Sequence, residues 1–272
     1  AASPATLVMS KAGSATSASN VNISGDGVGT TTDAATLSAS GAITLDSDGA
    51  GADQIETLTI SGNGAAATFT DGSATAPTTL AMTGSQDVTY VTTAANAATM
   101  TAVTNTATAG TQTLEITGAV ATADWKGVAA DVINVNGAVA AASTQTFKDA
   151  ASVKFETAQT NAFTIDIDDG SATTTQAAGS LSLDLAADTT GIVTIDKSLA
   201  TDNITTLNVT ATAAQTALAI TDAGGAVVTV NLSGSVGVVT HATNMKAASL
   251  NGASMTGALD ATLNADLLTI TG

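Results

Sequence analysis

One short pattern of apolar and small polar positions recurs along the chain and ends in glycine. It reads TLTISG at 57–62, TLAMTG at 79–84 and TLEITG at 113–118. Looser copies of the pattern occur further along the chain, at 132–137, 229–234, 247–252 and 267–272. Alternation of this kind is typical of a half-buried strand, and the glycine is typical of the turn that follows it. We therefore expect a strand at each copy.

The copies are spaced regularly enough to predict a fold. About 20 residues separate Gly62 from Gly84, and a similar step separates Gly252 from Gly272. A step of this length is typical of supersecondary units stacked on one another. We predict an all-β, mostly parallel β-solenoid (β-helix-like) with coils of about 20 residues. The same alternation also permits tandem β-sandwich domains, which remain the alternative.

The strength of the pattern divides the chain into four segments. Residues 1–41 are rich in Ser, Thr, Ala and Gly and are expected to form an N-terminal arm or capping coil; residues 42–118 should form a β-solenoid segment. Residues 119–160 are expected to be an irregular insertion or a junction, and residues 161–272 a second β-solenoid segment. Two segments could form short helices, 119–130 and 241–248. The chain stops directly after a strand pattern, so we expect a mature or excised portion of a longer protein.

The composition favours a narrow interior. Hydrophobic residues make up 44% of the chain, but much of this is alanine, and only 2% of the residues are aromatic. Large side chains normally dominate core energetics, so a conventional globular core would be thinly filled. The closely spaced strands of a solenoid can be filled by Ala, Val, Leu and Ile.

The charge excludes several partners. The formal net charge is −17, from 23 acidic residues against six lysines and no arginine. Binding to a nucleic-acid backbone or an anionic membrane surface requires clustered cationic side chains, so the charge balance disfavours both partners. In addition, no apolar run approaches the ~18–20 residues that cross a bilayer. Uncompensated carboxylates repel one another, so a divalent cation is the natural partner. With no cysteine, the chain has neither disulfides nor thiolate metal sites.

The first candidate cation site is an acidic, glycine-bearing stretch at 46–56, DSDGAGADQIE. Asp46 and Asp48 precede a glycine as in the opening of a calcium loop, and Asp53 and Glu56 could complete an oxygen shell. Calcium takes six to eight oxygen ligands, which a flexible loop can bring together. The alternative is a solvated acidic turn, since Asp and Gly are ordinary turn residues.

The second candidate site is Asp166, Asp168 and Asp169, followed by a glycine. In a strand, Asp166 and Asp168 share one face while Ile165 and Ile167 point to the core. Like charges so close are unfavourable unless a bound cation or solvent screens them. Isolated acids beside glycine, such as Asp71, are interpreted as turn residues.

Catalysis finds little support, and we predict that the chain is not an enzyme. His241 is the only histidine, and no nucleophile signature accompanies it; we interpret it as a surface or turn residue. Carboxylate pairs can hydrolyse glycans, but sugar clefts rely on aromatic platforms, which one Trp and one Tyr cannot supply.

Threonine is abundant and alternates in places, as at Thr104, Thr106 and Thr108. Regular ladders of threonine on a flat face can order water, as in ice-binding proteins. Repetition from coil to coil is not visible in the sequence, and threonine is common in strands because it is β-branched.

The segment DQIETLTISG at 53–62 resembles the "GIETLNVSG"-like units of bacterial surface-layer (S-layer) proteins of the type I secreted, RTX-related kind. The segments at 205–210 and 248–259 are similar to further units of these proteins. The resemblance implies a β-rich or β-solenoid architecture, calcium-dependent folding and assembly into a two-dimensional lattice. The Gly-Gly-x-Gly-x-Asp repeat of RTX proteins is absent.

The pattern, the charge and the resemblance together predict a structural, extracellular surface-layer protein. It would self-assemble into a lattice on the bacterial cell surface, stabilised by calcium, with itself as partner and a cell-surface polysaccharide as a possible anchor. Two alternatives remain at this point: a segment of a secreted adhesin that binds cells or polysaccharide, and a β-helix enzyme that acts on polysaccharide.

Overall fold

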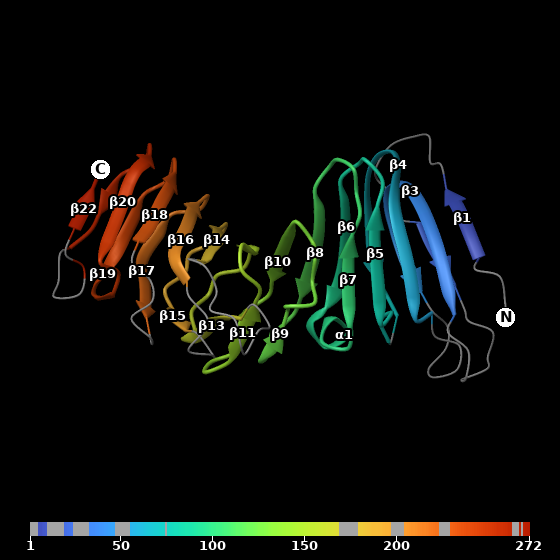
Figure 1. Cartoon of the computed structure of the whole chain (residues 1–272), viewed down its shortest axis with the longest axis horizontal. Coiled ribbons are helices and arrows are strands. Elements are labelled where there is room, and N and C mark those ends of the chain that lie inside the picture. The colour runs from blue at the N-terminus through green and yellow to red at the C-terminus, as the bar shows by residue number, and fades with distance from the viewer. Residues whose placement is uncertain are drawn as a thin grey trace. The chain divides into compact units, whose positions relative to one another are not determined.

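The computed structural model is almost entirely β, with 62% strand and 2% helix. Parallel strands lie in stacked coils that form a β-solenoid of about nine turns (Figure 1). The structure describes residues 5–9, 19–23, 33–46, 55–73, 75–168, 179–196, 204–222, 229–262, 267 and 269–272. The predicted fold class is therefore confirmed, and the parallel pairing is unlike the antiparallel sheets of the β-sandwich alternative.

Contacts divide the chain into two units. Unit 1 comprises residues 1–117 and 127–133, and unit 2 comprises residues 118–126 and 134–272. The elements of unit 1 are β1 (Ala5–Met9), β2 (Ser19–Asn22), β3 (Ala34–Asp46), β4 (Thr57–Asp71), β5 (Thr79–Thr83), β6 (Val88–Thr93), α1 (Ala94–Ala97), β7 (Ala102–Asn105) and β8 (Gln112–Thr117). Residue 41, the end of the predicted N-terminal arm, lies inside β3.

The elements of unit 2 are β9 (Ala123–Asp124), β11 (Thr144–Phe147), β12 (Ser152–Phe155), β13 (Phe163–Ile167), β14 (Gly179–Leu185), β15 (Ile192–Asp196), β16 (Ile204–Ala211), β17 (Gln215–Asp222), β18 (Thr229–Gly234), β19 (Val238–Met245), β20 (Ser249–Met255), β21 (Leu259–Asp260) and β22 (Thr269–Thr271). β10 (Val132–Asn136) has residues in both units.

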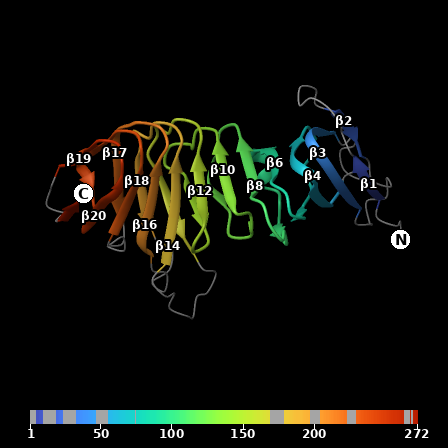
Figure 2. The ribbon, with the colours of Figure 1, turned by 90° about the horizontal axis from the view of Figure 1, so that it is seen from above.

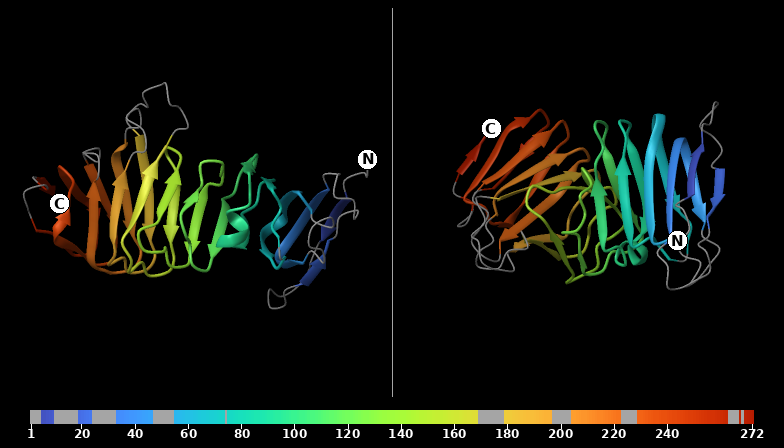
Figure 3. Two further views of the ribbon diagram at one scale, coloured as in Figure 1. Left: turned by 90° about the horizontal axis from the view of Figure 1, so that it is seen from below. Right: turned by 45° about the vertical axis from the view of Figure 1, so that its right-hand side comes forward.

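In unit 1, the first two copies of the recurring pattern lie directly over one another (Figure 3, blue to green), whereas the third copy, in β8, pairs with β6. Thr57 pairs with Thr79 and Leu58 with Leu80, so like residues meet in adjacent coils. The first half of β4 pairs with β5, which pairs with β7, while the second half of β4 pairs with β6, which pairs with β8. Each coil of this unit therefore contributes two stretches of parallel strand.

In unit 2, successive strands alternate between two parallel sheets. The even-numbered strands β12 to β22 form the first sheet, and the odd-numbered strands β9 to β21 form the second (Figure 2). Strands such as β14 and β15 bury every second residue, as period-two alternation requires, whereas β13 buries three consecutive residues at its end. Leu181, Leu207, Val230 and Leu250 stack in register and are fully buried.

The recurring glycines serve two different purposes. Gly84 and Gly234 adopt positive φ angles of 97° and 131°, which fit the expected turns. At Gly62 and Gly252 the strands β4 and β20 continue, so the expectation that these glycines close a strand is wrong. A Cβ at Gly62 would come within 2.5 Å of the Gln86 Cβ. The close approach of the Gln86 side chain therefore explains why residue 62 is a glycine.

Both short helices suggested by the sequence are absent from the described structure. Residues 119–130 contain β9, and residues 241–245 belong to β19, which pairs with β17. Strand pairing with the neighbouring coil overrides weak local helical character in both places. The short helix that does form is α1, where the Thr93 hydroxyl accepts from the Asn96 N–H at 3.2 Å.

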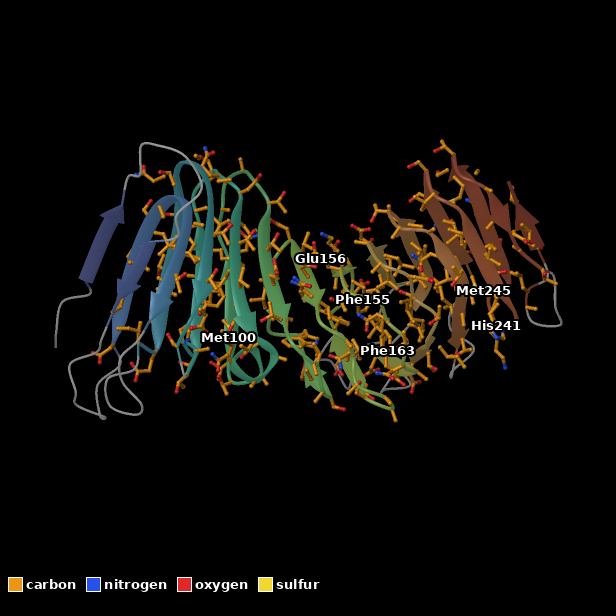
Figure 4. All side chains as sticks on the ribbon, turned by 180° about the vertical axis from the view of Figure 1, so that it is seen from behind. Met100, Phe155, Glu156, Phe163, His241 and Met245 are labelled. Atoms are coloured by element: carbon orange, nitrogen blue, oxygen red, sulfur yellow. The ribbon has the colours of Figure 1, made fainter. Side chains whose placement is uncertain are left out.

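Every aromatic side chain of the chain is buried. All are at most 2% exposed: Phe69, Tyr90, Trp125, Phe147, Phe155 and Phe163. In unit 2, the rings of Phe155 and Phe163 meet edge to face with centroids 5.6 Å apart (Figure 4). The few large side chains therefore fill the interior of the coils and leave no aromatic platform on the surface.

Candidate functional site

The first predicted cation site lies mostly outside the described residues. Asp48 and Asp53 fall there, as does the side chain of Asp46, whose backbone ends β3. Glu56 is described, and its Oε2 accepts from the Asp33 N–H at 2.7 Å. The Glu56 N–H in turn donates to the Asp33 carbonyl at 3.1 Å. Glu56 thus ties the main chain of its own coil to the residue that precedes β3.

The second predicted site is placed more fully. Asp166 and Asp168 are only 6% and 8% exposed, and Ile165 and Ile167 are buried as predicted, while Asp169 lies outside the described residues. The hydroxyl of Thr146, one coil earlier, donates to Asp166 Oδ2 at 3.4 Å. These carboxylates are therefore much less solvated than carboxylates on an exposed strand face would be.

Lys126 supplies the positive charge beside Asp168. Its Nζ lies 2.5 Å from Asp168 Oδ2 and 3.5 Å from Asp124 Oδ2. The hydrogen bond to Asp168 raises the pKa of Lys126, partial burial opposes this, and the Asp124 charge adds to the rise. Lys126, which is 42 residues away in the sequence, therefore screens the charge of Asp168. From the sequence we expected a bound cation or solvent to do so, and not a lysine.

A second charged network of unit 2 surrounds Glu156 (Figure 4). Glu156 Oε2 accepts from Asn134 Nδ2 at 2.7 Å, and Lys154 Nζ lies 3.3 Å from Oε1. The hydrogen bond from Asn134 lowers the pKa of Glu156, burial opposes the shift, and Lys154 lowers the pKa further. These contacts join adjacent coils and favour the ionised carboxylate.

The described residues contain no group of three or more His, Cys, Asp or Glu side chains that could hold a metal ion. Calcium binding at the acidic stretch of residues 46–56 thus stays a prediction from the sequence. His241 lies half-buried in β19 rather than in a turn (Figure 4). Within the described part of the chain, no helix is long and apolar enough to cross a membrane.

Asp71, at the end of β4, is a buried carboxylate that the sequence presented as a turn residue. It is 8% exposed, and both of its carboxylate oxygens accept hydrogen bonds. Oδ1 accepts from the Ser73 N–H at 3.0 Å, and Oδ2 accepts from Thr92 Oγ1 at 2.9 Å and Asn96 Nδ2 at 3.1 Å. Donors from three places in the fold therefore offset the cost of burying this charge.

Tyr90 lies beside Asp71 and is fully buried. Burial raises the pKa of Tyr90 well above its ordinary value, and the charge of Asp71 and a hydrogen bond to it raise the pKa further. A cavity of about 30 Å³ adjoins the pair, lined by Ile23, Leu45, Ile55, Leu58, Asp71, Ser73, Thr75, Pro77 and Tyr90. A space of this size holds about one water molecule rather than an organic substrate.

Buried glutamines form a further set of polar residues that sequence reasoning missed. Gln159 Oε1 accepts from the Val139 N–H at 2.8 Å, and Gln159 Nε2 donates to the Gly137 carbonyl at 3.0 Å. Nε2 also donates to the Thr157 carbonyl of its own coil at 2.7 Å. The amide thus brackets two residues of the preceding coil and satisfies backbone groups in the interior.

Gln215 repeats this arrangement farther along unit 2. Its Oε1 accepts from the Thr189 N–H at 2.9 Å, and its Nε2 donates to the carbonyls of Ala187 at 3.1 Å and Ala213 at 2.8 Å. The only indication of these buried glutamines in the sequence is a glutamine at a position where strand alternation predicts an apolar residue. We call Gln159 and Gln215 the bracket glutamines.

The fold and these contacts define a parallel β-solenoid whose buried polar groups serve to join one coil to the next. Comparison with known proteins finds no matching family model, no matching curated protein and no matching solved structure.

Proposed function

We propose that this chain is part of a structural, extracellular surface-layer protein that self-assembles into a lattice on the bacterial cell surface, stabilised by calcium. The observation that carries the proposal is the in-register stacking of the repeated pattern. Thr57 over Thr79 and Asn208 over Asn231 create surfaces with a regular spacing. Surfaces of this kind are suited to a lattice, in which the same contact forms many times.

The buried polar groups support a mechanical function. Asp71, Asp168 and Glu156 are each engaged by donors from other parts of their own unit. A general acid or nucleophile needs instead to face a space that admits substrate. The cavity beside Asp71 has a volume of about 30 Å³, which is too small for a sugar ring.

The burial of all six aromatic side chains also disfavours the adhesin alternative in its sugar-binding form. Carbohydrate recognition commonly uses exposed aromatic rings, and the surface of this chain offers none of its six. Contact between copies of the chain needs no such platform.

Calcium is included because of the net charge of −17 and the acidic stretch at residues 46–56. A hard cation that binds several carboxylates would reduce the repulsion within one copy and between copies. Calcium is favoured over transition metals because the available ligands are carboxylate and carbonyl oxygens.

The test is assembly of the purified chain in calcium, in magnesium and in chelator at equal ionic strength. We expect calcium to raise the melting temperature, followed by circular dichroism, and to produce sheets visible by electron microscopy. The combined variant Asp46→Asn, Asp48→Asn and Asp53→Asn should need more calcium for both effects, whereas Asp260→Asn, at an exposed position of β21, should not.

Two results would count against the proposal separately. If the fold and the sheets survive chelation unchanged, the calcium part is wrong while the lattice part stands. If the chain stays monomeric at every calcium and protein concentration, the lattice part is wrong.

A further inference from the structure

The outward side chains of the first sheet of unit 2 form straight columns from coil to coil. We call the outward face of β16, β18, β20 and β22 the ladder face (Figure 2). In one column Thr206, Thr229 and Ser249 are in register. In the next column Asn208, Asn231 and Asn251 are in register, although the sequence alone does not show this alignment.

Some polar groups of this face hydrogen-bond to one another from coil to coil, in the asparagine column and between Thr210 and Ser233. Asn231 Nδ2 donates to Asn208 Oδ1 at 2.9 Å, and Asn251 Nδ2 donates to Asn231 Oδ1 at 3.3 Å. The hydroxyls of Thr210 and Ser233 lie 3.0 Å apart. A polar group that is already hydrogen-bonded within the face loses fewer hydrogen bonds when the water above it is removed. These pairs therefore lower the desolvation cost of covering the ladder face.

The ladder face is also neutral in a chain of net charge −17. The described strands β16, β18, β20 and β22 contain no Asp, Glu, Lys, Arg or His. Charged residues lie on the neighbouring strands outside the face, with Asp184 on β14 and Lys154 on β12. The second sheet of the same unit carries Asp196 and Asp260.

We infer that the ladder face of one copy docks against the ladder face of a second copy. This inference rests on the proposed self-assembly and identifies the surface that performs it. Two chains that each carry −17 repel wherever acidic surfaces meet, and a contact that is neutral on both sides avoids this repulsion. A neutral face meets this condition on both copies at once, which makes the contact isologous.

The size of the face predicts a weak contact. Four strands spaced about 4.8 Å apart and about six residues long present on the order of 400 Å² per copy. A stable dimer buries about 800 Å² on each partner. The contact is therefore expected to form at high protein concentration and to gain strength from repetition in an array.

The test uses opposite charges at the centre of the face. Thr229→Asp and Thr229→Lys should each raise the protein concentration needed for assembly by about tenfold or more, because like charges then meet across the contact. An equimolar mixture of the two variants should assemble as the unsubstituted chain does. The matched controls are Thr144→Asp and Thr144→Lys, at a half-buried outward position of β11 in the second sheet, and these should assemble alone.

The same pair of substitutions at Thr206 provides a second test if a Thr229 variant does not fold by circular dichroism. Assembly that persists in both single variants, or that the mixture does not restore, overturns the docking surface but leaves the proposed lattice intact. An unsubstituted chain that never assembles overturns both. If the chain stays monomeric and binds insoluble polysaccharide or ice, and Thr229→Asp abolishes that binding, the ladder face binds that ligand. This result overturns the inference that a second copy docks there.

Discussion

At the scale of single residues, the feature with the largest consequence is the buried pair Asp71 and Tyr90. A carboxylate that is 8% exposed is tolerated because Ser73, Thr92 and Asn96 donate to it. The donors Thr92 and Asn96 lie 21 and 25 residues along the chain. Local sequence around Asp71 shows only a turn-like Asp-Gly pair, so the burial could not be predicted from it.

Tyr90 should make unit 1 sensitive to alkaline pH. Its pKa is raised in the folded state, so the stabilisation from the neutral phenol is fully present below the ordinary pKa of about 10 and is lost as pH rises above that value. Tyr90 is the only tyrosine, so the ultraviolet absorbance of tyrosinate reports on it alone. We expect that signal to appear together with the loss of β-sheet circular dichroism.

The Tyr90→Phe variant provides the control for this prediction. It cannot ionise, so its alkaline transition should move to higher pH, although it loses a hydrogen bond worth about 1 kcal/mol at neutral pH. If tyrosinate absorbance rises near pH 10 while the circular dichroism stays unchanged, the Tyr90 phenol ionises in the folded state with its ordinary pKa. That result would contradict its burial beside Asp71.

At the scale of elements, adjacent coils are joined by side chains as well as by the backbone ladder. The bracket glutamines each satisfy one N–H and two carbonyls where regular strand pairing is interrupted. Close backbone approach contributes as well, because a Cβ at Gly191 would lie 1.9 Å from the Asn161 carbonyl oxygen. The corners of the coils are therefore as specific as the strands between them.

Replacing a bracket glutamine should destabilise unit 2 markedly. Gln215→Met keeps the volume similar but leaves the Thr189 N–H and two carbonyls without this partner in the interior. Each buried group left unsatisfied costs about 1–3 kcal/mol, so we expect a loss of at least about 2 kcal/mol in chemical denaturation. Gln86→Met is the matched control, because the Gln86 amide contacts only the Ser85 hydroxyl at 3.5 Å, and it should change stability by less than about 0.5 kcal/mol. Equal effects of the two substitutions would contradict the bracket.

At the scale of the whole molecule, the charge balance dominates. Six lysines face 23 acids, and the ion pairs of Lys126 and Lys154 both involve acids of unit 2. Most of the negative charge is therefore compensated by solvent ions or bound cations. Parallel coils built from neutral Thr, Asn, Ala and Val keep much of that charge away from the ladder face.

Salt should therefore stabilise the chain even without calcium. Raising sodium chloride from about 10 mM to about 300 mM shortens the screening length several-fold, which weakens repulsion among the acids. We expect the melting temperature to rise by about 2–4 °C for each kcal/mol gained. Calcium chloride at equal ionic strength distinguishes binding from screening, since only binding adds a further increase. A melting temperature that is independent of sodium chloride would show that the acids do not repel significantly.

The sequence by itself determined the fold class of this protein, because the alternation of apolar and polar residues along a strand and the glycine-marked step are local properties of the chain. The regular step of about 20 residues favoured parallel stacking, since burial of one side of each strand fits a β-sandwich as well. The helices proposed at 119–130 and 241–248 were wrong because pairing with a neighbouring coil outweighs weak local preference.

Only the tertiary structure decided which side chains meet. Gln159 reaches back 22 residues to Gly137 but Gln215 reaches back 28 to Ala187, since the loops between strands differ in length from coil to coil. The position of a partner therefore depends on the whole coil and not on the local pattern. For the same reason the pairing of Lys126 with Asp168, and the asparagine column of the ladder face, emerge only when the coils are stacked.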